Sequence, residues 1–184
     1  MANLITLARM ALVVPFVFVF LANAPWNMTA ALIIFVIAAL TDFVDGRVAR
    51  ARGECSALGA ALDPIADKLI VAAALILLAR NGVIAGYGVV AVIIIILREI
   101  LVSGLREALA AAGQTLAVTP LAKWKTTAQL VAAGLMLAAA PTGIAGEALR
   151  PAASAALWLA AILTLWTGGD YSVRAAALLK DKRA

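Results

Sequence analysis

Four aspartates are spaced in two pairs, each of which would share one face of a helix. Asp42 and Asp45 are three residues apart, and Asp63 and Asp67 are four residues apart. A turn between the two helices would bring the four carboxylates together. Such a cluster repels itself strongly unless cations neutralise it. Because all-oxygen ligands select Mg²⁺, Mn²⁺ or Ca²⁺, the spacing predicts a divalent-metal site, with two ions as is usual in phosphoryl chemistry.

Small residues and one base accompany these aspartates. Gly46 and Ala49 share the face of the first pair, and Gly59 shares the face of the second, which would let a bulky anionic group approach the backbone. Arg50 is placed to clamp a phosphate. Aspartates at helix ends often serve only as caps, and Asp63, which precedes a proline, fits a helix start. Four aspartates with glycines on their own faces favour the metal site instead.

The composition indicates that the helices carrying these residues are embedded in lipid. The sequence is 65% hydrophobic and 14% charged, with a mean hydropathy of +1.06, whereas a soluble domain is roughly 45–50% apolar and 25% charged. No soluble module is apparent that would bind nucleic acid, so we expect the net charge of +5 to face anionic lipid and anionic substrates. Histidine is absent, so acid–base chemistry must fall to other residues, and the single Cys55 cannot form an internal disulfide.

Six apolar stretches come close to the length of a membrane span, provided that helical extensions complete them. They are about 8–24, 26–41, 65–83, 85–97, 130–141 and 152–166. The small residues Ala22 and Ala24 would also fit a signal-peptide cleavage site, but we interpret residues 10–24 as a span. Short polar segments at 23–25, 80–82 and 141–143 predict turns.

An even number of spans places both termini on one side of the membrane. All 15 basic residues except Arg80 and Arg150 fall on that side, which the positive-inside bias makes cytoplasmic. The predicted fold is therefore all-α: a polytopic membrane protein with six transmembrane helices and a cytoplasm-facing active site. We expect one domain over residues 1–184, with a pre-span segment at 1–9 and a basic tail at 174–184.

The aspartate region resembles the signature of the CDP-alcohol phosphotransferase family. Every specified position of D-x₂-D-G-x₂-A-R-x₈-G-x₃-D-x₃-D is matched, by Asp42, Asp45, Gly46, Ala49, Arg50, Gly59, Asp63 and Asp67. The resemblance implies a six-helix, homodimeric enzyme of the inner (cytoplasmic) membrane. It would transfer a phosphatidyl group from CDP-diacylglycerol to a small alcohol and release CMP.

The resemblance also implies roles for single residues. Asp42, Asp45 and Asp63 would ligate two divalent ions, Mg²⁺ or Mn²⁺. Asp67 would touch one of these ions and act as the general base toward the acceptor hydroxyl. The residues that would contact CDP-diacylglycerol are Asn3, Thr6, Gly46, Arg50 and Ser56.

Three later segments, residues 98–107, 123–129 and 163–171, resemble the branch of the family whose acceptor is sn-glycerol 3-phosphate. A phosphorylated acceptor needs cations of its own near the metal site. Four bases are available for its phosphate: Arg98, Arg106, Lys123 and Lys125. The alternative is that these bases only snorkel to the membrane interface and fix orientation, and it stays open here.

Other functions also stay open. A phosphatidylinositol phosphate synthase would share the signature and take a phosphorylated acceptor, and transfer onto phosphatidylglycerol is a further variant. From a different class, a divalent-cation transporter would use the four aspartates as a permeation site. Its acids should line a path through the spans, whereas the acids of this sequence gather toward one end of them.

Overall fold

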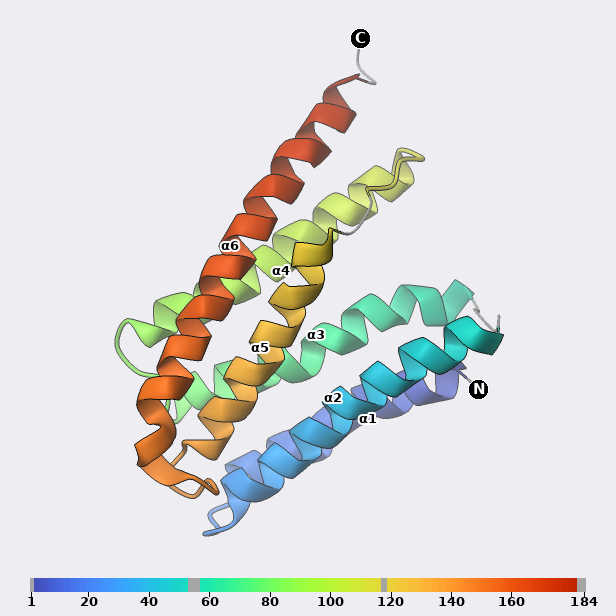
Figure 1. Cartoon of the computed structure of the whole chain (residues 1–184). Helices are drawn as coiled ribbons and strands as arrows, with labels where there is room; N and C mark the ends of the chain where they lie inside the picture. The colour runs from blue at the N-terminus through green and yellow to red at the C-terminus, as the bar shows by residue number, and fades with distance from the viewer. Residues whose placement is uncertain (1, 53–56, 117–118, 182–184) are drawn as a thin grey trace. The chain divides into compact units, whose positions relative to one another are not determined.

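The computed structural model describes the backbone of residues 2–52, 57–116 and 119–181, and their side chains except at 2–6, 42–52, 57–64, 67, 120, 123, 179 and 181. These ranges hold six α-helices, one short 3₁₀ helix and no strand, which confirms the all-α prediction (Figure 1). The elements are α1 (Ala2–Leu21), α2 (Asn27–Arg52), α3 (Ala57–Arg80), α4 (Gly88–Ala111), α5 (Pro120–Ala138), η1 (Gly146–Leu149) and α6 (Arg150–Asp181).

Each predicted span falls on its own helix, and the helices extend into polar sequence as expected. α2 continues to Arg52, α4 to Ala111 and α6 to Asp181. The predicted site residues whose backbone the structure describes therefore lie on regular helix and not on loops. The predicted turns are also found, and Gly82 and Gly86 between α3 and α4 adopt positive φ values of 72° and 54°, a backbone region that glycine enters without a steric penalty.

Two helical segments in the described part of the chain are long and apolar enough to cross a membrane, Gly88–Ala111 and Gly146–Leu178. Leu7–Leu21 and Asn27–Thr41 are apolar but shorter. Large apolar side chains such as Ile100 and Trp166 are exposed on the longer helices, as expected for surfaces that face lipid. A topology with six spans stays a prediction.

The chain folds as two compact units. The first comprises Met1–Ile84 and Ala133–Ala153, and the second comprises Ala85–Ala132 and Ser154–Ala184. Helices α5 and α6 contribute residues to both units. The predicted metal ligands belong to the first unit, and the predicted acceptor cations belong to the second.

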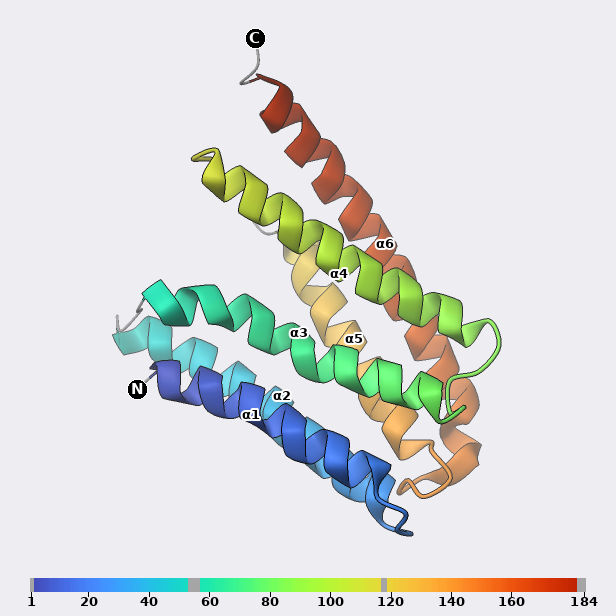
Figure 2. The same ribbon diagram turned by 180° about the vertical axis from the view of Figure 1, so that it is seen from behind.

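In the first unit, α1 packs against both α2 and α3 (Figures 1 and 2). Phe16 is fully buried at this packing, with its ring centroid 6.0 Å from that of Phe20 and 6.3 Å from that of Phe35, and both ring pairs are tilted by 48°. Tilted aromatic pairs at this separation add to the stabilisation from apolar burial. The Phe16–Phe35 contact holds α1 beside α2, which carries the first pair of aspartates.

Polar side chains tie the α1–α2 turn to the loop after α5. The side-chain amide of Asn27 donates to the backbone carbonyl oxygens of Phe20 (3.1 Å) and Ala22 (2.8 Å). The Thr142 hydroxyl donates to the Asn27 amide oxygen, and the Thr29 hydroxyl donates to the Thr142 carbonyl oxygen at 3.1 Å. These hydrogen bonds pair backbone carbonyl groups of the turn with side chains of the protein. The turn therefore does not need water molecules to satisfy those groups.

In the second unit, an apolar cluster joins α4 to α6. Val102 and Leu109 of α4 are buried against Tyr171 and Ala175 of α6. Leu105, Leu116 and Leu178 pack around this cluster. The cluster holds the two helices together on the C-terminal side of the polar residues described next.

Candidate functional site

The four predicted metal ligands lie on α2 and α3. Asp42 and Asp45 are three residues apart on α2, and Asp63 and Asp67 are four residues apart on α3. These two helices contact each other, and the chain between them is only residues 53–56. Two adjoining helices that each bring a pair of carboxylates supply an all-oxygen donor set, which fits a divalent ion such as Mg²⁺ or Mn²⁺.

The side chains of these four aspartates lie outside the described residues. The side chains that are described contain no group of three or more potential metal ligands. The metal site therefore stays a prediction. The same holds for the donor contacts: Asn3 and Thr6 on α1 and Gly46 and Arg50 on α2 are placed by backbone alone, and Ser56 is outside the described residues.

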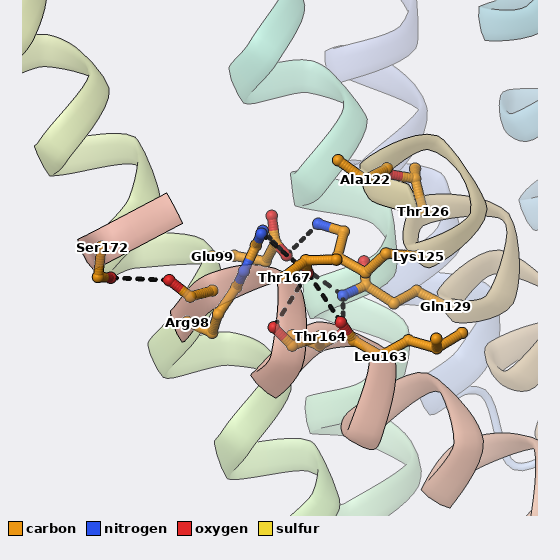
Figure 3. A network of polar contacts seen from close by, with 11 residues as sticks. Arg98, Glu99, Ala122, Lys125, Thr126, Gln129, Leu163, Thr164, Thr167 and Ser172 are labelled. Carbon is orange, nitrogen blue, oxygen red and sulfur yellow. Dashed lines mark hydrogen bonds and ion pairs between the residues drawn. The ribbon is translucent and has the colours of Figure 1, made fainter. Parts of the chain in front are cut away.

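A polar network centred on Glu99 occupies the interior of the second unit (Figure 3). The carboxylate oxygen Oε1 of Glu99 accepts a hydrogen bond from the guanidinium nitrogen Nη1 of Arg98 at 3.0 Å. The same oxygen is ion-paired with the ammonium group of Lys125 on α5. Arg98 is 9% exposed and Lys125 is 5% exposed, so both ion pairs are shielded from water. Two of the four predicted acceptor cations are thus brought together by one acid.

Three further side chains extend this network. The amide nitrogen of Gln129 donates to Oε1 of Glu99 at 3.2 Å and to the hydroxyl oxygen of Thr164 at 2.8 Å, which uses both of its hydrogens. The hydroxyl oxygen of Thr167 accepts from the nitrogen Nη2 of Arg98 at 3.1 Å. Helices α4, α5 and α6 therefore each contribute to one hydrogen-bonded group (Figure 3).

The three ionised members of the network, Arg98, Lys125 and Glu99, together carry a net positive charge. Charges in an apolar interior are costly unless they are paired and hydrogen-bonded. In this network one carboxylate is shared by two cations from different helices, so each of these buried charges has a counter-charge.

The other two predicted acceptor cations are Arg106, whose side chain the structure describes, and Lys123, whose side chain it does not. The guanidinium carbon of Arg106 lies 6.0 Å from the centre of the Tyr171 ring, a cation–π geometry. Arg106 is exposed on α4, and Tyr171 belongs to the apolar cluster that joins α4 to α6. The side chain of Lys123 lies outside the described residues. A role for either residue in binding acceptor stays a prediction.

A profile of CDP-alcohol phosphatidyltransferases matches residues 1–166. The chain belongs to this family. Curated relatives are similar over nearly the whole chain and carry the name CDP-diacylglycerol–glycerol-3-phosphate 3-phosphatidyltransferase. The relative from Bacillus subtilis is 39% identical over 182 residues, covering 92% of this chain and 91% of its own length. The relative from Escherichia coli K12 is 38% identical over 184 residues, covering 98% and 97%. The relative from Cereibacter sphaeroides is 37% identical over 194 residues, covering 88% of each.

As a CDP-alcohol phosphatidyltransferase the chain is an enzyme, and the family generally depends on a divalent metal. Family membership and the two long apolar helical segments make it a membrane protein. The resemblance that the aspartate signature indicates is therefore confirmed at the level of the family. The match to residues 1–166 covers the aspartate region and the whole Glu99 network except Thr167.

Several members of the network were not predicted as site residues from the sequence. Glu99, Gln129, Thr164 and Thr167 all sit in apolar helices, where a polar side chain requires a partner. Gln129 is four residues after Lys125, and Thr167 is three residues after Thr164, so each pair shares a helix face. That spacing was a usable signal, but it does not reveal which residue on another helix is the partner.

The network predicts that Glu99 is important for stability. Glu99→Gln keeps the size of the side chain but leaves Arg98 and Lys125 without their shared counter-charge. Removing the charge of one partner of a buried ion pair costs about 3–5 kcal/mol of stability. Because the glutamine amide can still form hydrogen bonds, we expect the free energy of unfolding to fall by about 3 kcal/mol. Denaturant-induced unfolding of the full chain in detergent micelles measures this loss.

The matched control is Glu147→Gln, which removes the same charge from an exposed pair with Arg150 at 3.3 Å, where the Glu147 side chain is 71% exposed. Exposed pairs contribute little, so this variant should unfold like the parent protein. Equal stability of the two variants would show that the Glu99 network does not hold the second unit together.

Proposed function

We propose that the chain transfers the phosphatidyl group of CDP-diacylglycerol to sn-glycerol 3-phosphate, with phosphatidylglycerophosphate and CMP as products. The names of relatives at 37–39% identity support this reaction. The structural observation that carries the phosphorylated acceptor is the pairing of Arg98 and Lys125, from two helices, on the single carboxylate of Glu99. An acceptor without an anionic group, such as choline, would have no use for two buried cations.

On the donor side, the proposed ligands of two divalent ions, Mg²⁺ or Mn²⁺, are Asp42, Asp45 and Asp63, with Asp67 touching one ion. The ions would supply positive charge for the pyrophosphate of the donor. Gly46, Arg50 and Ser56 would contact the cytidine diphosphate part. Asn3 and Thr6 are at the start of α1, which packs on the two aspartate-bearing helices, and we assign them to the same substrate.

On the acceptor side, Arg98 and Lys125 would bind the phosphate, with Arg106 and Lys123 as further cations. Guanidinium and ammonium groups form charge-assisted hydrogen bonds with phosphate oxygens. Holding the phosphate end fixes the orientation of the acceptor, so that its free hydroxyl is presented for reaction. Such positioning reduces the entropic part of the barrier.

In the chemical step, the acceptor hydroxyl oxygen forms a bond to the phosphorus that bears the diacylglycerol. The bond from that phosphorus to the bridging oxygen of the pyrophosphate breaks, and CMP leaves with that oxygen. Asp67 takes the proton of the hydroxyl as general base. The nucleophile needs such a base because an alcohol is a weak nucleophile at neutral pH.

We further propose a multi-pass arrangement in the inner (cytoplasmic) membrane, with both termini and the active site on the cytoplasmic side. The distribution of basic residues supports this orientation, and the water-soluble acceptor would then be taken from the cytoplasm. A homodimer is proposed from the family resemblance.

An acceptor panel tests the reaction. Purified full-length protein is given labelled CDP-diacylglycerol and, separately, glycerol 3-phosphate, inositol phosphate, serine, choline and phosphatidylglycerol. We expect CMP release and a phosphatidylglycerophosphate product with glycerol 3-phosphate, dependent on Mg²⁺ or Mn²⁺ and abolished by EDTA. Turnover with another acceptor in place of glycerol 3-phosphate, or full activity in EDTA, would contradict the proposal.

The general-base assignment predicts a split between binding and chemistry in Asp67→Asn. Removing a general base lowers the rate by roughly 10²–10⁴-fold, whereas three aspartates are left to hold metal and donor. Single-turnover assays should therefore show slow product formation with CDP-diacylglycerol still bound. Asp63→Asn is the comparison variant, for which we expect Mn²⁺ binding and turnover to fall together. Turnover of Asp67→Asn near the parent rate would exclude Asp67 as the base.

The acceptor-phosphate assignment predicts a selective change in Arg98→Ala. Loss of a charge-assisted contact to phosphate costs roughly 1.5–3 kcal/mol, so KM for glycerol 3-phosphate should rise by roughly tenfold or more. KM for CDP-diacylglycerol should change much less. Arg174→Ala is the control, because it removes the same side chain from a half-exposed pair with Asp170 in the same unit. Equal effects of Arg98→Ala on both KM values would contradict the assignment.

A further inference from the structure

One turn of α6 fits closely around the side chain of Arg98. Thr167 is 4% exposed, and its hydroxyl oxygen lies 3.1 Å from Nη2 of Arg98. The hydroxyl hydrogen of Thr167 is directed at the backbone of its own helix, with the carbonyl oxygens of Leu163 at 2.8 Å and Thr164 at 3.2 Å. Because this hydrogen is committed to the backbone, the oxygen presents its lone pairs to the guanidinium.

Gly168, the next residue, provides the space that Arg98 occupies. A Cβ atom built on Gly168 would come within 2.6 Å of Cγ and 3.0 Å of Nε of Arg98. These distances are too short for real carbon contacts, so the stem of Arg98 rests directly on the backbone of α6. Gly169 offers a contrast, because a Cβ atom there meets nothing within 4 Å.

The geometry leaves donors of Arg98 available for a ligand. Nη1 donates to Glu99 at 3.0 Å and Nη2 donates to Thr167 at 3.1 Å. Each of these nitrogens carries two hydrogens, so among the described residues each keeps a second N–H. Phosphate oxygens accept charge-assisted hydrogen bonds from guanidinium N–H groups of this kind.

We propose that Thr167 and Gly168 are positioning residues that hold the Arg98 guanidinium for the phosphate of the acceptor. This inference rests on the proposed function, in which Arg98 binds that phosphate. Glu99 and Thr167 each fix one terminal nitrogen, and Gly168 sets the depth of the side chain against α6. The segment 163–171 thus acts on acceptor affinity through Arg98, without contacting the reacting atoms.

Gly168→Ala and Gly169→Ala are a matched pair for the test, since both make the same change at neighbouring positions of one helix. In the full-length enzyme with CDP-diacylglycerol in mixed micelles, Gly168→Ala should raise KM for glycerol 3-phosphate by about tenfold, the effect of losing one well-placed contact to phosphate. KM for CDP-diacylglycerol should stay within about twofold. Gly169→Ala should leave both values at those of the parent protein.

Thr167→Val tests the second positioning residue and does not depend on how Gly168→Ala folds. Valine has nearly the shape of threonine but cannot accept the hydrogen bond of Nη2, so KM for glycerol 3-phosphate should rise selectively. Thr167→Ser, which keeps the hydroxyl, should restore the parent value. A purely structural role would lower stability and both affinities together, and would not produce this selectivity.

Double variants show whether the effect passes through Arg98. In an Arg98→Ala background, Gly168→Ala should raise the acceptor KM no further, because the displaced side chain is already gone. Independent, multiplying effects would overturn the inference, as would equal acceptor KM values for Gly168→Ala and Gly169→Ala. If Arg98→Ala raises the acceptor KM while Gly168→Ala and Thr167→Val do not, only this inference fails. If Arg98→Ala itself leaves that KM unchanged, the proposed acceptor site fails as well.

Discussion

An ionised side chain inside an apolar helical bundle must find its counter-charge within the protein, because lipid provides neither charge nor hydrogen bonds. Removing an ion from water costs several kcal/mol even after relaxation. Glu99 meets this requirement for Arg98 and Lys125 together, at exposures of 9% and 5% for the two bases. The second unit is organised around this acid, because α4, α5 and α6 all contribute polar side chains to its network. The apolar cluster of Val102 and Tyr171 lies on the C-terminal side of the network along α4 and α6.

The same requirement explains why small and hydroxyl-bearing residues occur where the charges are. Thr164 and Thr167 are among the few polar residues on the buried side of α6, at 0% and 4% exposure. Each accepts a hydrogen bond from a longer side chain of another helix, Gln129 and Arg98 respectively. Gly168 lets the Arg98 stem reach this position without an outward shift of α6. The close packing of the Arg98 side chain against the backbone of α6 thus depends on the absence of a side chain at Gly168.

Much of this organisation could be predicted from the sequence, and the parts that could not have a common cause. Composition and apolar stretches were sufficient for the helix class and for the position of all six helices, and the fixed spacing from Asp42 to Asp67 was sufficient for the family. Local patterns could identify Arg98 and Lys125 as available cations. They could not identify Glu99, the neighbour of Arg98, as the partner of Lys125 also, because the contact between Glu99 and Lys125 joins residues 26 apart in the chain. The division into two units depends on long-range packing in the same way, and no local pattern in the sequence marks it.

In the proposed reaction, metal ions bind the pyrophosphate of the donor, whereas organic cations bind the phosphate of the acceptor. This difference has a physical reason. Glycerol 3-phosphate has an anionic end and a hydroxyl end, and only the hydroxyl end is to meet the donor. A divalent ion attracts any phosphate oxygen, so metal alone would draw the anionic end of the acceptor toward the donor and leave the hydroxyl turned away. Organic cations held by Glu99 give the acceptor phosphate a separate place to bind, with geometry set by hydrogen-bond direction. The proposed donor site thus relies on metal charge and the proposed acceptor site on the direction of hydrogen bonds, so each substrate would have its own kind of partner.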